Sequence, residues 1–163
     1  MNKVFLSLLV SVLLHNISLA ADEPGSLGYA VSLLQKSEPK VSWDTKSAVS
    51  SDFTCDGKKD IALVGYGKKD AVWIGVVSGG QKTDAVNPTT MSFGINNMDQ
   101  ASFCSTPVEI ESRPISCEDE DIGLLPGCKP IKGCSAFSLV DGACDSFHFY
   151  WDANQSKLVW WRR

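Results

Sequence analysis

The chain has 163 residues, 15 of them basic and 19 acidic, which gives a net charge of −4 at neutral pH. This acidic balance argues against proteins that hold nucleic acid or an anionic membrane surface by positive charge. The length fits one domain, and a hydrophobic content of 44% is sufficient for a globular core.

The N-terminal segment predicts a secretory signal peptide of residues 1–20. Lys3 precedes a short apolar run, and Ser18 and Ala20 place small residues at the minus-three and minus-one positions of a cleavage site. The run is too short for a membrane-spanning helix. We therefore expect export to the periplasm or beyond, with residues 21–163 as a single mature domain. Its net charge is −5, because Lys3 is the only charged residue removed.

Residues 25–37 predict one helix. Their apolar residues recur at a spacing that forms one helical face. These residues are Leu27, Ala30, Val31, Leu33 and Leu34. Pro39 follows, and a proline disfavours helical backbone at the residue before it.

Residues 52–60 form an Asp-rich loop with carboxylates at loop positions 1, 5 and 9 and Gly57 at position 6. This spacing suits oxygen coordination of calcium. The predicted ligands are Asp52, Thr54, Asp56, the carbonyl of Lys58, and Asp60. Leu63 stands where an EF-hand has its bidentate glutamate, so the loop is not an EF-hand. The alternative is an Asp-Gly turn whose carboxylates cap backbone N–H groups.

The loop and the aliphatic strand that follows it, Asp52 to Tyr66, resemble the calcium-type loops of FG-GAP and VCBS-type β-repeats. The pattern of those repeats is close to Asp-x-Asn-x-Asp-Gly-x-x-Asp. Thr54 and Cys55 depart from it, and Cys55 is a candidate for a covalent anchor of the loop. The resemblance implies a β-rich fold and a bound calcium ion.

From residue 60 onward, the periodicity changes to that of strands. We expect strands at 60–66, 71–77, 89–95, 108–114, 135–140, 146–151 and 157–163. The segments between them predict a polar loop at 79–88, a helical turn at 96–102 and an irregular, disulfide-held loop at 115–133. The last three strands should be antiparallel neighbours. The fold class is therefore mainly β with one N-terminal helix, as an antiparallel meander, small barrel, sandwich or propeller-like arrangement.

All six cysteines lie in the mature part: Cys55, Cys104, Cys117, Cys128, Cys134 and Cys144. An even number in an exported chain predicts disulfides. Zinc is the weaker interpretation, since no Cys-x-x-Cys pair occurs. We predict sequential pairing, as Cys55–Cys104, Cys117–Cys128 and Cys134–Cys144.

No catalytic set stands out. His148 should share one strand face with Ser146 and Tyr150, and no nucleophile elbow accompanies it. Glu109, Glu111 and Glu118 offer carboxylate pairs, as any acidic protein does. We therefore expect no enzymatic activity, with an unrecognised hydrolase as an alternative.

The aromatic carboxyl end suggests a binding surface. Large aromatic residues next to arginine have the composition of interface hot spots, although core packing would also account for them. The predicted contacts are Tyr150, Trp161 and Arg163, together with the loop residues Ser78, Gly79 and Gly80.

In size, export and β-content the chain resembles periplasmic lysozyme inhibitors and immunity proteins. Its Ser78-Gly79-Gly80 loop is similar to the Ser-Gly loop that some of those inhibitors insert into a lysozyme cleft. The resemblance implies an exported protein that blocks a cationic cell-wall hydrolase or a similar effector. A structural calcium-binding envelope protein is the alternative.

Overall fold

The computed structural model describes residues 23–68, 70–80, 87–96 and 100–163, and its fold is mainly β with one α-helix. The helical elements are α1 (Leu27–Ser37) and the 3-10 turn η1 (Thr45–Ser47). The strands are β1 (Ser42–Trp43), β2 (Val49–Ser51), β3 (Asp60–Gly67), β4 (Ala71–Val77), β5 (Thr89–Ile95), β6 (Ser102–Phe103), β7 (Glu109–Pro114), β8 (Glu118–Asp119), β9 (Gly123–Leu124), β10 (Ser135–Val140), β11 (Phe147–Asp152) and β12 (Lys157–Trp161). Neither main sheet closes into a barrel.

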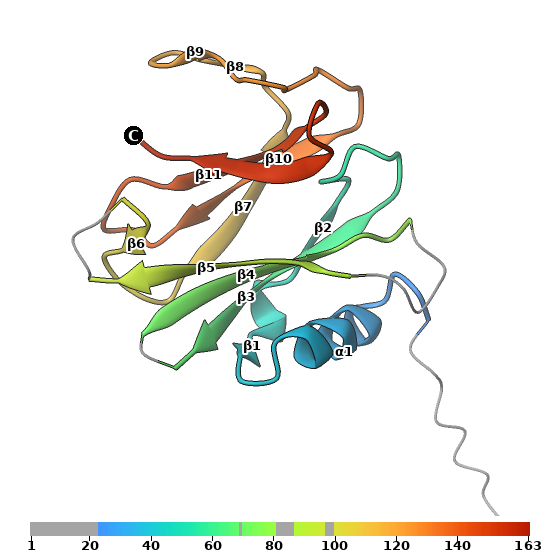
Figure 1. Cartoon of the computed structure of the whole chain (residues 1–163), viewed down its shortest axis with the longest axis vertical. Helices are drawn as coiled ribbons and strands as arrows, with labels where there is room; N and C mark the ends of the chain where they lie inside the picture. The colour runs from blue at the N-terminus through green and yellow to red at the C-terminus, as the bar shows by residue number, and fades with distance from the viewer. Residues whose placement is uncertain (1–22, 69, 81–86, 97–99) are drawn as a thin grey trace, which may run out of the picture.

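Two open sheets are stacked as a sandwich (Figure 1). The first has the order β1-β3-β4-β5-β6, with β2 also paired to β3, and the second has the order β12-β11-β10-β7. Helix α1 covers the outer face of the first sheet, and the small β8–β9 hairpin lies at the opposite end of the molecule, beyond the second sheet (Figure 1). The predicted antiparallel order of the last three strands is confirmed.

The main core lies between the two sheets. The six-stranded sheet contributes aliphatic residues, and the four-stranded sheet contributes a cluster of phenylalanines. These residues include Val64, Val72, Ile74, Phe137, Phe147 and Phe149. Strand β3 is buried on both faces, because Ala62 faces this core while Leu63 packs beneath α1. That double burial explains the uninterrupted apolar run after the Asp-rich loop.

Helix α1 confirms the predicted N-terminal helix and begins at Leu27. The side chain of Ser26 caps it by accepting a hydrogen bond from the backbone N–H of Tyr29 at 3.1 Å. Ala30 and Leu34, one turn apart, are its buried residues. Pro39 follows the C-cap residue Glu38 and stops the helix there.

The disulfides confirm that all six cysteines are paired, but two of the three predicted pairs are wrong. Cys117–Cys128 is present as predicted, whereas Cys55 pairs with Cys134 and Cys104 pairs with Cys144. Sequential pairing was wrong because strand pairing brings distant segments together. The backbone N–H of Ser135 donates to the carbonyl of Asp52, which places Cys134 beside the Asp-rich loop.

Smaller differences concern the connections. The segment predicted as an irregular loop at 115–133 contains the β8–β9 hairpin. At 96–102 the described residues form no helical turn, and residues 97–99 lie outside the described part. Of the predicted loop at 79–88, residues 81–86 also lie outside it. Strands β1, β2 and β6 were not predicted, because runs of two or three residues carry no detectable period.

Removing the Cys55–Cys134 disulfide by paired serine substitution is expected to destabilise the fold more than removing Cys117–Cys128. The sequence separations are 79 and 11 residues. Loop-closure entropy predicts a difference of about 1.7 kcal/mol, within a total of about 2–5 kcal/mol for each bond. Urea unfolding measures both losses. Equal losses, or a Cys55–Cys104 link in peptide maps of unreduced protein, would contradict the pairing.

Candidate functional site

The Asp-rich loop is organised by its own backbone. Asp52 accepts hydrogen bonds from the N–H groups of Asp56 and Gly57, at 3.0 and 2.9 Å, and Asp56 accepts one from Lys58 at 2.8 Å. These contacts fit the alternative to calcium coordination, an Asp-Gly turn whose carboxylates cap backbone N–H groups. Among the residues that the structure describes, no group of three or more His, Cys, Asp or Glu side chains is placed to hold a metal ion. Calcium at this loop stays a prediction.

The third carboxylate of the loop, that of Asp60, points inward and is fully buried. Its Oδ2 accepts the N–H groups of Phe53 and Thr54, both at 2.8 Å, and its Oδ1 accepts that of Gly79 at 3.1 Å. Burial raises the pKa of the Asp60 carboxyl, while its hydrogen bonds act in the opposite direction. Asp60 thus joins the loop to the end of β4.

The hydrogen bond from Gly79 to Asp60 gives the Ser78-Gly79-Gly80 loop a structural role in the fold. A Cβ atom added at Gly79 would overlap the carbonyl of Lys59, and one at Gly80 would overlap the Asp56 carboxylate. Gly79 is therefore needed for the close approach of two backbone segments, whereas Gly80 meets only the end of an exposed side chain. A substitution at Gly79 would disturb the fold as well as any partner contact.

The other predicted partner-binding residues lie in the four-stranded sheet or, for Arg163, directly after its strand β12. Tyr150 is a core residue, 7% exposed, and its hydroxyl donates to the carbonyl of Pro126 at 2.9 Å. It therefore offers no surface to a partner in this structure. Trp161 is half-buried against His148, with ring centroids 4.4 Å apart. Arg163 is exposed and forms ion pairs with Asp121, at 2.8 Å, and Asp119, at 3.8 Å.

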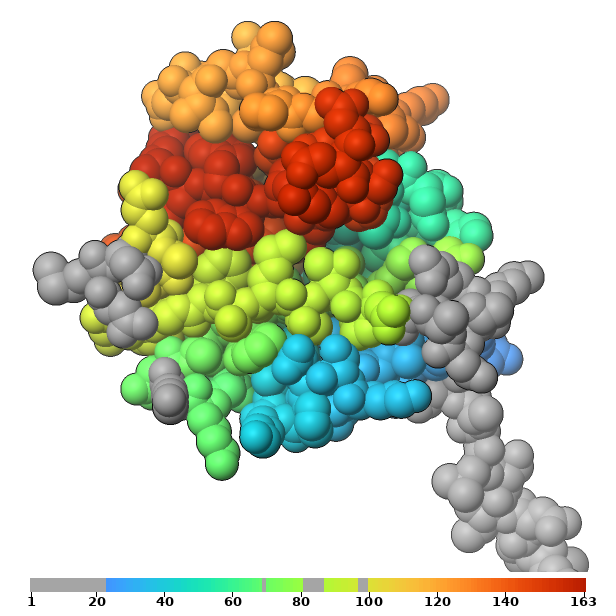
Figure 2. All heavy atoms as spheres, viewed as in Figure 1, coloured from blue at the N-terminus to red at the C-terminus, as the bar shows by residue number. Residues whose placement is uncertain are grey.

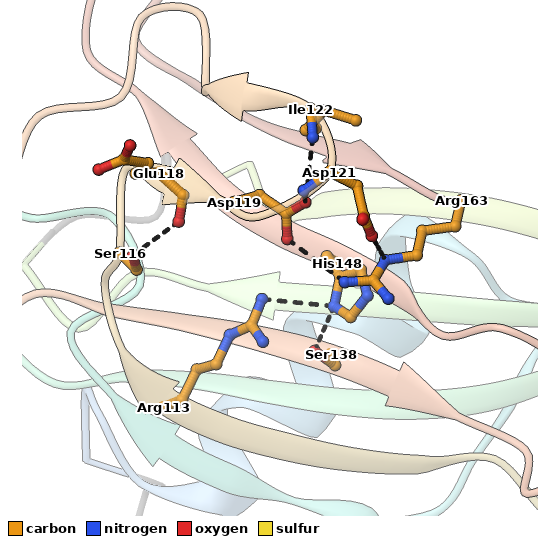
Figure 3. Close-up of polar contacts among 9 residues, drawn as sticks. All are labelled: Arg113, Ser116, Glu118, Asp119, Asp121, Ile122, Ser138, His148 and Arg163. Carbon is orange, nitrogen blue, oxygen red and sulfur yellow. Dashed lines mark hydrogen bonds and ion pairs between the residues drawn. The ribbon is translucent and has the colours of Figure 1, made fainter.

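His148 lies among Arg113, Ser138 and Arg163 on the outer face of this sheet (Figure 3). It is two positions from Tyr150 in β11 and so shares its strand face, as predicted. Its Nδ1 is 2.8 Å from the hydroxyl of Ser138 and 3.3 Å from a guanidinium nitrogen of Arg113. Because Arg113 can only donate, Nδ1 is the acceptor and the neutral ring carries its proton on Nε2. Ser138 is 4% exposed, so its hydroxyl is not open to a substrate. The pair orients the imidazole ring.

Beside His148 and its contacts lies a segment that we name the stapled hairpin, residues 117–128. The Cys117–Cys128 disulfide closes its base, and Asp119 Oδ1 accepts the N–H groups of Asp121 and Ile122 at 3.0 and 3.3 Å across its turn. In Figure 2 this segment, in orange, forms the end of the molecule opposite α1. Its underside is anchored by Leu125, which packs on Tyr150.

The stapled hairpin carries two exposed large apolar side chains. Ile122 is 51% exposed and Leu124 is 78% exposed, the largest fraction among the exposed large hydrophobic residues of the described chain. The neighbouring acidic residues are Glu118, Asp119, Glu120 and Asp121. The sequence predicted a disulfide-held loop here but not an apolar tip, since the exposure of Leu124 depends on which neighbour, Leu124 or Leu125, turns inward.

Comparison of the chain with models of protein families, with curated protein sequences and with solved structures finds no match. No helix in the described part of the chain has the length and apolarity needed to cross a membrane. The three disulfides are typical of an oxidising, exported compartment.

Mutation of the exposed carboxylate of Asp56 and of the buried carboxylate of Asp60 is expected to affect stability in different ways. Calcium should raise the melting temperature of the wild-type protein; binding to the native state alone contributes about 2.7 kcal/mol at a hundredfold excess over Kd. Asp56→Asn should abolish that shift, because it removes an exposed charge yet keeps the acceptor for Lys58. Asp60→Ala should cost about 3 kcal/mol or more with and without calcium, because one buried and two partly buried N–H groups lose their acceptor.

Scanning calorimetry in calcium and in chelator measures both effects. Equal melting temperatures for the wild-type protein in the two buffers would mean that the loop is a turn that binds no calcium. A wild-type melting temperature for Asp60→Ala would overturn the role of the buried carboxylate.

Proposed function

We propose that this protein is an exported, non-enzymatic binding protein that blocks another protein, and that the stapled hairpin is its contact surface. The periplasm is the proposed compartment, and a cationic cell-wall hydrolase or a similar effector is the proposed target. The predicted signal peptide and the disulfides support export.

The observation that carries the proposal is the exposure of Leu124 and Ile122 on a clamped segment. Single exposed apolar residues are ordinary on protein surfaces. Here the two residues lie two positions apart on one short hairpin, with the buried Leu125 and a disulfide fixing the base beneath them. An apolar tip on a rigid support offers contact area at a small cost in conformational entropy.

The charges around the tip define the partner. Glu118 and Glu120 form no ion pair within the described part of the chain, whereas Asp119 and Asp121 share Arg163. The hairpin therefore keeps an excess negative charge, in a mature domain whose net charge is −5. A partner with an apolar pocket bordered by lysine or arginine is complementary to this surface and would be attracted to it at long range.

Leu124→Ala should weaken binding to the target while leaving the melting temperature unchanged. Loss of the buried part of a leucine side chain is worth about 1.5 kcal/mol, or roughly a tenfold increase in Kd. The probes are purified cationic cell-wall hydrolases, with binding measured by calorimetry and inhibition measured by release of labelled peptidoglycan. The matched control is Leu27→Ala, a 38% exposed leucine on α1.

If the Leu124→Ala variant inhibits as well as the wild-type protein, or if Leu27→Ala reduces inhibition equally, the hairpin is not the contact surface. Absence of binding to every hydrolase in the panel would remove this class of target.

A further inference from the structure

The imidazole of His148 lies within a set of charges that reaches the stapled hairpin (Figure 3). Arg113 of β7 and Ser138 of β10 contact its Nδ1, and the ring of Trp161 of β12 packs against its ring at a tilt of 35°. Arg163, which follows β12, connects the cluster to the hairpin through its ion pairs with Asp119 and Asp121. The cluster therefore joins the sheet, the end of the chain and the hairpin.

The charges that act on His148 are of both signs. Burial, Arg113 and Arg163 disfavour the imidazolium, and Asp119 and Asp145 favour it. Glu111, opposite Ser138 in the neighbouring strand β7, adds a carboxylate to the same face and forms no ion pair within the described part of the chain. The net effect lowers the pKa of His148 from its ordinary value of 6.5, with burial as the largest cause.

We propose that His148 is a proton-sensitive regulator of the stapled hairpin, whose protonation in mildly acidic solution shifts Asp119 from Arg163 toward the imidazolium and so changes the position of the hairpin. This inference rests on the proposed function, because it assigns a regulator to the same binding surface.

Protonation reverses the contacts of the ring. An Nδ1–H group can no longer accept a hydrogen bond from Arg113, and the new positive charge repels both Arg113 and Arg163. Asp119 is available as the counter-charge, because its backbone hydrogen bonds from Asp121 and Ile122, followed by the charge of Arg163, hold the pKa of its carboxyl below 3.8. It is thus ionised at the pH where His148 takes up a proton.

The direction of the effect follows from the lowered pKa of His148. Since the unfolded chain takes up this proton near pH 6.5 and the folded chain does so at lower pH, His148 makes folding less favourable as the pH falls between these two values. The hairpin, which belongs to the folded chain, should therefore change about a midpoint below pH 6.5.

The test is an NMR titration of the isolated protein from pH 8 to pH 4.5. The imidazole Cε1–H signal reports the protonation of His148, and the backbone amides of Asp119, Asp121, Ile122 and Leu124 report the hairpin. We expect one shared midpoint below 6.5. His148→Gln should abolish the amide transition, because glutamine keeps a hydrogen-bonding group but does not titrate. Asp145→Asn, the control, should lower the midpoint and keep the transition.

Two results would overturn the proposal: hairpin amides that stay constant while His148 titrates, or an amide transition that persists in His148→Gln. Because no partner is present, the outcome is independent of whether the protein binds a hydrolase. A failed inhibition assay with a positive titration would reject the target and keep the regulator, and the converse would reject the regulator alone.

Discussion

The carboxylate of Asp60 is the contact on which the arrangement of the two sheets depends. It is fully buried and accepts the N–H groups of Phe53, Thr54 and Gly79, so it fixes the Asp-rich loop against the end of β4. A buried carboxylate is unfavourable unless hydrogen bonds satisfy it, and here three backbone donors do so. The result is a polar joint inside a β-rich fold.

The Asp-rich loop that Asp60 fixes also contacts the second sheet. The loop carries Cys55, which is bonded to Cys134, and the carbonyl of Asp52 accepts the N–H of Ser135 at the start of β10. The hydroxyls of Ser51 and Ser135 are 2.6 Å apart and add a side-chain contact. Strand β10 also carries Ser138, which orients His148 beneath the stapled hairpin. The geometry of the proposed binding surface thus depends on contacts that begin at the Asp-rich loop.

Local patterns predicted most of the elements, because their information lies within a few residues. The helix at 27–37 has a capping serine and a terminating proline, and Asp141 closes the turn between β10 and β11 by accepting the N–H groups of Ala143 and Cys144 at 2.9 Å. The two-residue period of β11 placed His148 and Tyr150 on one strand face, opposite the face whose Phe147 and Phe149 enter the core. In each case the sequence separation is short.

Long-range contacts were not predictable in the same way. The pairing of Cys55 with Cys134 depends on a bridge between segments about eighty residues apart, and Cys104 meets Cys144 beside Asp141, whose carboxylate also accepts the N–H of Cys104. The burial of Tyr150 follows from the hairpin that folds over it. No periodicity encodes these features, since they arise only when the sheets are assembled.

The exposed tip of the stapled hairpin is the place where we propose that a partner protein is bound. Site-specific photo-crosslinking in the exporting cell tests this most directly, with a photoreactive residue in place of Leu124 or, as a control, in place of Leu27 on α1. The account predicts a defined protein adduct from position 124 that unlabelled protein competes away, and no such adduct from position 27. Absence of an adduct at 124, or the same adducts from both positions, would contradict it.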